Sequence, residues 1–87
     1  MTRYRQNPRV AFQILDGAAF LVQPRDHTMH RLDDVGTFIW EALGRPRTAD
    51  EVARSVEEAF EVEAETAARD AREFLGELET RGLVLID

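Results

Sequence analysis

The chain contains no cysteine and no lysine, and Ser55 is its single serine. Without cysteine it can form no disulfide scaffold, no thiolate metal site and no thiol nucleophile. Ser55 falls inside a predicted helix and lacks the glycine-flanked turn that exposes a nucleophilic serine. The five glycines are scattered and form no phosphate-binding loop.

Long apolar runs are also missing. The longest, residues 18–22, is far shorter than the roughly 20 residues that a transmembrane helix needs. The N-terminal segment MTRYRQNPRV has arginines but no apolar core behind them, so it does not have the pattern of a signal peptide. We therefore expect a soluble, cytoplasmic protein that does not associate with a membrane.

Few side chains are suited to metal binding or catalysis. His27 and His30 are spaced as H-x-x-H, but residues three apart in a strand point to opposite faces, and no third ligand lies nearby in the sequence. The acidic pair Asp33-Asp34 begins a predicted helix, where Asp33 serves as the cap. The sequence therefore predicts a binding protein and not an enzyme, with no catalytic residue, no cofactor and no metal site.

Charge is distributed unevenly along the chain, whose net charge is −6. Residues 1–32 carry five arginines and two acids, whereas residues 33–87 carry six arginines and fifteen acids. An acidic surface repels phosphate backbones, so we expect no binding to nucleic acid. The length of 87 residues, with 44% hydrophobic and 32% charged side chains, fits a single folded domain over 1–87.

Hydrophobic residues recur with a period of two up to residue 32, which predicts strands. Asp16-Gly17 favours a two-residue hairpin turn of type I′. Pro24 is expected to end the second strand, and a third strand is predicted over 28–32. One apolar face of the hairpin is expected to carry Val10, Phe12, Ile14, Phe20 and Val22, with Leu21 on the other face.

From residue 33 the apolar period is close to 3.6, which predicts three helices. The first runs from the Asp33 cap to Gly44, and the second opens with the capping box of residues 48–51. The third spans about 64–81, and a short buried strand follows over 83–86. The expected fold is α+β and winged-helix-like: a three-stranded antiparallel N-terminal sheet, three helices and a short C-terminal strand.

Two functions are compatible with this shape. A winged-helix regulator would read DNA with its third helix, but the acids of that helix outnumber its arginines. Alternatively, the third strand is the last of its sheet, and an unpaired edge can capture an extended peptide. Trp40, beside the apolar stripe of the first helix, either flanks the core or contacts a partner.

Several segments resemble the PqqD-like family in order and spacing. MHRLDDVGTFIWEAL over 29–43 is similar to its "v-x-x-L-N-x-x-a-x-x-I-W-x-x-L" pattern, and RTADEV over 47–52 to "r-T-x-x-E-l". FEV over 60–62 and DAREFLGELETRGL over 70–83 are similar to "y-x-v" and "D-v-x-x-F-L-x-x-L-x-x-x-G-L". The resemblance covers about residues 20–86.

This resemblance implies a recognition element for precursors of ribosomally synthesised, post-translationally modified peptides, that is, a peptide chaperone. Such a protein holds the leader peptide as an added strand and presents it to a modifying enzyme, often a radical S-adenosylmethionine protein. The peptide contacts implied for this chain are Thr28, Met29, His30, Arg31, Leu32, Arg72, Phe74, Leu75 and Leu78. His30, Arg31 and Arg25 near Arg72 would favour a peptide with acidic residues beside apolar anchors.

The chain also departs from the family pattern. Asp33 replaces the usual asparagine, which is still a helix cap. Pro24 matches the second-strand proline of the pyrroloquinoline quinone members, but the Asp-Gly that commonly ends their first helix is replaced by residues 43–46, LGRP. The sequence thus favours the broad family over the pyrroloquinoline quinone protein itself. Lasso-peptide partner proteins share this fold, so the pathway stays open.

Overall fold

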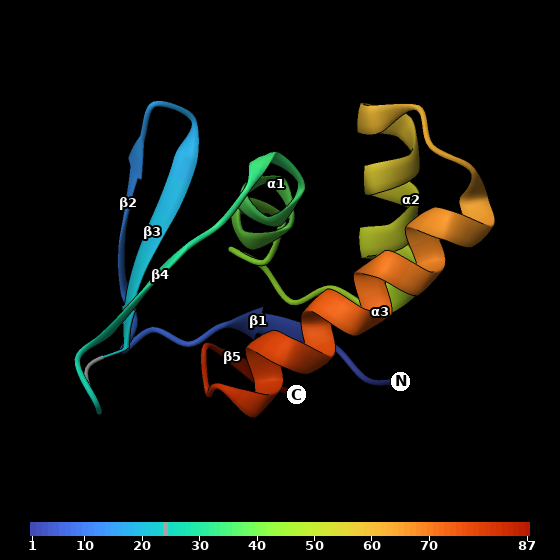
Figure 1. Ribbon diagram of the computed structural model, residues 1–87. Helices are drawn as coiled ribbons and strands as arrows, with labels where there is room; N and C mark the ends of the chain where they lie inside the picture. The colour runs from blue at the N-terminus through green and yellow to red at the C-terminus, as the bar shows by residue number, and fades with distance from the viewer. Residues whose placement is uncertain (24) are drawn as a thin grey trace.

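The computed structural model describes residues 1–23 and 25–87, and it has the expected α+β class (Figure 1). Its elements in chain order are β1 (Tyr4–Gln6), β2 (Ala11–Leu15), β3 (Ala18–Gln23), β4 (Thr28–Arg31), α1 (Asp34–Ala42), α2 (Ala49–Phe60), α3 (Ala64–Thr80) and β5 (Val84–Ile86). The antiparallel sheet β2-β3-β4 precedes the three helices, as predicted. Pro24, which was expected to end the second strand, lies outside the described residues.

The β2–β3 hairpin has the predicted turn, since Asp16 and Gly17 both have positive φ, 52° and 78°. Its faces differ from the prediction. A two-residue turn pairs Leu15 with Ala18, so Phe12 lies opposite Leu21 and shares its face, while Phe20 and Val22 lie on the other. The single apolar face predicted for the hairpin was therefore wrong, and each face of the sheet carries its own apolar side chains.

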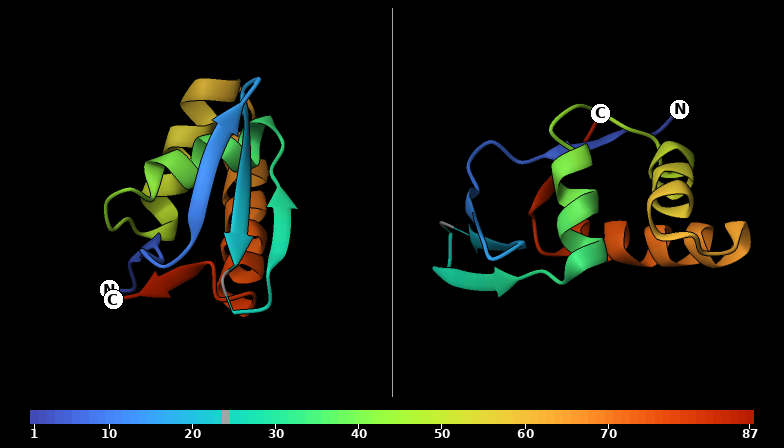
Figure 2. Two further views of the ribbon diagram at one scale, coloured as in Figure 1. Left: turned by 90° about the vertical axis from the view of Figure 1, so that its left-hand side faces the viewer. Right: turned by 90° about the horizontal axis from the view of Figure 1, so that it is seen from above.

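The inner face of the sheet packs on α1. Ala19 and Leu21 are fully buried there, and the Phe12 ring meets the Trp40 ring edge-on with centroids 5.4 Å apart. The outer face looks away from the helices, and Figure 2 shows β2, β3 and β4 side by side in front of them. The outer face therefore exposes apolar surface, including Met29 at 64%.

The chain also forms a second ladder that the sequence did not predict. β1 pairs antiparallel with β5, with Arg5 opposite Leu85, and Tyr4 exchanges two backbone hydrogen bonds with Arg47. β1 has only three residues and no apolar alternation, so its conformation depends on partners far along the chain. The predicted C-terminal strand is confirmed from Val84 on.

The starts of α1 and α2 are capped as their sequences predicted. Asp33 accepts a hydrogen bond from the Gly36 N–H at 2.8 Å. In the capping box, the Glu51 N–H donates to Thr48 Oγ1 at 3.1 Å and the Thr48 N–H donates to Glu51 Oε1 at 2.8 Å. That second bond lowers the pKa of Glu51. α3 is followed by Gly82 at φ +73°, the left-handed conformation that glycine favours.

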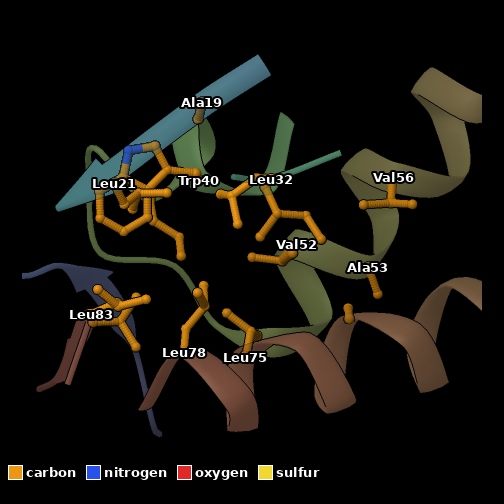
Figure 3. Packing of buried hydrophobic residues seen from close by; sticks show 14 of the residues in the cluster. Ala19, Leu21, Leu32, Trp40, Val52, Ala53, Val56, Leu75, Leu78 and Leu83 are labelled. Atoms are coloured by element: carbon orange, nitrogen blue, oxygen red, sulfur yellow. The ribbon is translucent and has the colours of Figure 1, made fainter. Parts of the chain in front are cut away.

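A hydrophobic cluster joins the sheet to all three helices and β5 (Figure 3). Trp40 has 0% exposure and is therefore a core residue, which decides between the two roles considered for it. Within residues 1–23 and 25–87, no helix combines the length and apolar character needed to span a membrane.

Candidate functional site

The edge of β4 is the first part of the candidate site. β4 is the last strand of its sheet and pairs with β3. Just past β4, the Leu32 N–H donates to the Ala19 carbonyl at 2.8 Å. Hydrogen bonding alternates along an antiparallel ladder, so Thr28 and His30 also bond toward β3. The N–H and C=O groups of Met29 and Arg31 therefore point away from the sheet, toward the open edge.

A groove lies beside this edge, between β4 and the C-terminal half of α3. Its side-chain lining comes from Leu32, Phe74, Leu78 and Leu83 and from His30, Asp33, Glu77 and Arg81. Met29 and Arg31 border it along the open edge of β4, because their own side chains lie on the outer face with Val22 and Phe20. The three leucines are buried, whereas Phe74 is half-buried and exposes part of its ring. The groove thus offers an apolar wall next to unpaired backbone groups.

The end of α3 is held against the sheet by two hydrogen bonds. Arg81 Nη1 lies 2.9 Å from His30 Nδ1, and because arginine is only a donor, the Nδ1 atom of His30 accepts. Gln23 Nε2 donates to the Arg81 carbonyl at 2.8 Å. The first bond positions the Arg81 guanidinium at one end of the groove, and the second holds the Arg81 main chain.

The structure brings most of the sequence-predicted contacts together but separates three of them from the groove. Met29, His30, Arg31, Leu32, Phe74 and Leu78 all line it. Arg72 lies on the other flank of α3, with Nη2 3.7 Å from Asp50 Oδ1 of α2. Leu75 has 0% exposure and belongs to the core. Thr28 is exposed at the start of β4, outside the groove lining.

Helical geometry accounts for this selection and for the residues that the sequence prediction missed. Each residue advances an α-helix by about 100°, so Leu78 and Arg81 lie within roughly 40° of Phe74 on the helix surface. Arg72 lies about 160° from Phe74, on the opposite flank. Glu77 and Arg81 could have been found from this spacing once Phe74 and Leu78 were placed in the groove.

The turn before β4 is also ordered by hydrogen bonding. The hydrogen bond between the carboxylate of Asp26 and Thr28 lowers the pKa of Asp26, and the Thr28 N–H donates to Asp26 Oδ1 at 3.1 Å. His27 adopts φ 58° in this turn. In the part of the chain that the structure describes, no group of three or more His, Asp or Glu side chains is placed to hold a metal ion.

The family described as Coenzyme PQQ synthesis protein D (PqqD) matches residues 18–84. No curated protein sequence is significantly similar to the chain.

Three solved structures share the fold. TbiB1 in complex with the TbiA(beta) leader peptide is 27% identical, with a TM-score of 0.82 over 92% of this chain and 93% of that chain. Lasso peptide synthetase B1 complexed with the leader peptide is 24% identical, with a TM-score of 0.82 over 94% and 96%. The PqqD truncation of Methylobacterium extorquens PqqCD, described as a functional, stand-alone RiPP recognition element, is 14% identical, with a TM-score of 0.76 over 95% and 88%.

Proposed function

This chain belongs to the PqqD family, and from that membership we propose that it binds the leader region of a ribosomally synthesised precursor peptide. The observation that carries the proposal is the open edge of β4 beside a partly apolar groove. TbiB1, which is similar to this chain over more than nine-tenths of its length, was solved with a leader peptide.

The proposed binding mode is strand addition to β4. The outward N–H and C=O groups of Met29 and Arg31 would bond to the peptide backbone, which supplies affinity for any extended sequence. Alternate peptide side chains would enter the groove and contact mainly the exposed part of the Phe74 ring, beside the almost fully buried Leu32 and Leu78, which supplies selectivity. Thr28 begins the edge strand and is kept as a contact at its end. We do not include Arg72, because it faces α2, or Leu75, because it has no exposed surface.

We further propose that the bound peptide is presented to a modifying enzyme, and that this protein itself performs no catalysis. A radical S-adenosylmethionine protein is the enzyme class that the family resemblance favours. Neighbouring genes for a short precursor peptide and such an enzyme would support this partner. A neighbouring gene for a peptide-modifying enzyme of another class would contradict it.

DNA binding is the weaker alternative. The helix that would enter a groove, α3, presents exposed acidic side chains at Glu65, Asp70, Glu73, Glu77 and Glu79. These would oppose a phosphate backbone, so tight duplex binding with a steep salt dependence would contradict the proposed function.

Amide hydrogen exchange tests the binding mode directly. A peptide selected from a random display library on this protein serves as the probe, and exchange is followed residue by residue by NMR. We expect the amides of Met29 and Arg31 to gain the most protection on binding, because their N–H groups point outward. Amides of β2 should change little. Protection along α2 instead of β4 would place the binding site elsewhere.

Substitutions of the neighbouring residues Phe74 and Leu75 distinguish a groove contact from a core residue. Phe74→Ala should speed dissociation of the selected peptide, because it removes the partly exposed ring from the groove wall. Leu75→Ala should lower the free energy of unfolding by about 2–5 kcal/mol, because its side chain is fully buried. The rate at which the selected peptide dissociates from Leu75→Ala, measured well below the melting temperature of the variant, should stay near the wild-type rate. Equal dissociation rates for wild type and Phe74→Ala would remove Phe74 from the proposed site.

A further inference from the structure

The two ends of the groove differ in charge. At one end stands Arg81, whose hydrogen-bonded side-chain partner, His30, accepts through a neutral nitrogen. Within residues 1–23 and 25–87, Arg81 forms no ion pair. Arg25 lies near Gly82 but lines a separate hollow with Arg9 and Gln23, so the positive charge in this end of the groove is that of Arg81. The positive charge of Arg81 is therefore available to a ligand.

Two acidic side chains also line the groove: Asp33 is engaged as a helix cap, whereas Glu77 lies on the same flank of α3 as Arg81 and forms no ion pair within residues 1–23 and 25–87. Asp33 caps α1 by accepting the Gly36 N–H, at the end of the groove near Phe74. Phe74 Cζ and Leu32 Cβ lie 3.1 and 3.3 Å from the position of a Cβ on Gly36, so both side chains lie beside this glycine. Glu77 precedes Arg81 by one helical turn and is exposed. The groove thus has an apolar end at Phe74 and a basic end at Arg81.

The strand register sets the spacing between these ends. His30, which bonds Arg81, and Leu32, which lies just past β4 and beside Gly36 with Phe74, are two residues apart and share the inner side of the strand. In a strand, residues two apart share a face. A peptide strand paired with β4 would therefore place two of its own side chains, also two apart, beside Arg81 and Phe74.

We propose that this protein selects a leader peptide with an acidic residue two positions from a large apolar residue, and that Arg81 is the residue that selects the acid. The proposal rests on the proposed function and specifies its ligand. The sequence predicted that Arg72 would select the acid. We assign this role to Arg81 instead, because Arg81 lines the groove and Arg72 does not. A carboxylate beside the fixed guanidinium would accept charge-assisted hydrogen bonds and hold the peptide in register.

Selection from a random 12-residue peptide library tests this inference. Wild type should enrich peptides with Asp or Glu two positions from Phe, Leu, Ile or Met. Arg81→Glu should enrich Lys or Arg at that position. The matched control is Arg72→Glu, which reverses the charge of another α3 arginine away from the groove, and it should enrich the same peptides as wild type.

Binding of one selected acidic peptide, synthesised with a fluorophore, gives the size of the effect. Its affinity should fall about tenfold for Arg81→Glu and less for Arg81→Gln, and a peptide with the acid changed to lysine should restore binding to Arg81→Glu. Thermal melting checks that both variants fold.

Two results would overturn the inference: Arg81→Glu enriching the same acidic peptides as wild type, or acids enriched at a different spacing. Failure of wild type to enrich any peptide would instead contradict the proposed function, and the inference with it.

Discussion

Replacing Arg31 with proline is expected to weaken binding of a selected peptide at least about fivefold while the domain stays folded. The Arg31 N–H points to the open edge of β4, and proline has no N–H to donate. A peptide carbonyl left without a partner beside the groove costs about 1–3 kcal/mol. Proline is tolerated on an edge strand, so the sheet should persist. Fluorescence anisotropy gives the dissociation constant, and circular dichroism reports the fold.

Two other substitutions control for this result. Arg31→Ala keeps the N–H but removes the guanidinium, which lies 5.9 Å from the centre of the Phe20 ring on the outer face. It should bind more tightly than Arg31→Pro. His30→Pro removes an N–H that bonds toward β3, so it should lower the stability of the fold itself. Equal peptide affinities for the proline and alanine variants at position 31 would argue against strand addition at β4.

Replacing Trp40 with alanine should lower the free energy of unfolding by about 3–5 kcal/mol. Trp40 has no exposed surface and packs edge-on against Phe12, so it joins α1 to the hairpin that carries the edge strand. Small domains are typically stable by about 5–15 kcal/mol, so this loss is a large fraction of the total. Urea unfolding, followed by circular dichroism, measures it.

Trp40→Phe provides the matched comparison. In the described part of the chain, Trp40 Nε1 is buried without a hydrogen-bond partner. Phenylalanine removes that unsatisfied N–H while filling most of the volume, so it should cost clearly less than alanine. A loss below about 1 kcal/mol for Trp40→Ala would contradict the buried position of this ring.

The features that the sequence predicted correctly depend on neighbouring residues. Asp16-Gly17 forms the predicted turn, and the cap at Asp33 and the capping box at Thr48 form as their spacing indicated. Such features involve residues a few positions apart, so local sequence is sufficient to specify them. The order of strands and helices followed from the change in apolar period. Family membership could also be predicted, because the order and spacing of the family's motifs extend over most of the chain.

Contacts between residues far apart in the chain are not specified by local sequence. β1 has no periodic signal and exists through its pairing with β5, more than 75 residues later. The flank of α3 that faces β4 depends on how the helix packs, and this packing puts Arg81 in the groove and leaves Arg72 near Asp50.

Some features of the candidate site are therefore specified by the local sequence, and others only by the tertiary structure. The sequence alone determined the edge strand, the apolar residues of α3 and the family, because strand and helix periods are local properties of the chain. The tertiary structure decided which amides of β4 face outward, which arginine stands at the end of the groove, and that Leu75 is core. Those facts depend on strand register and helix rotation, which are set by packing between segments far apart in the chain.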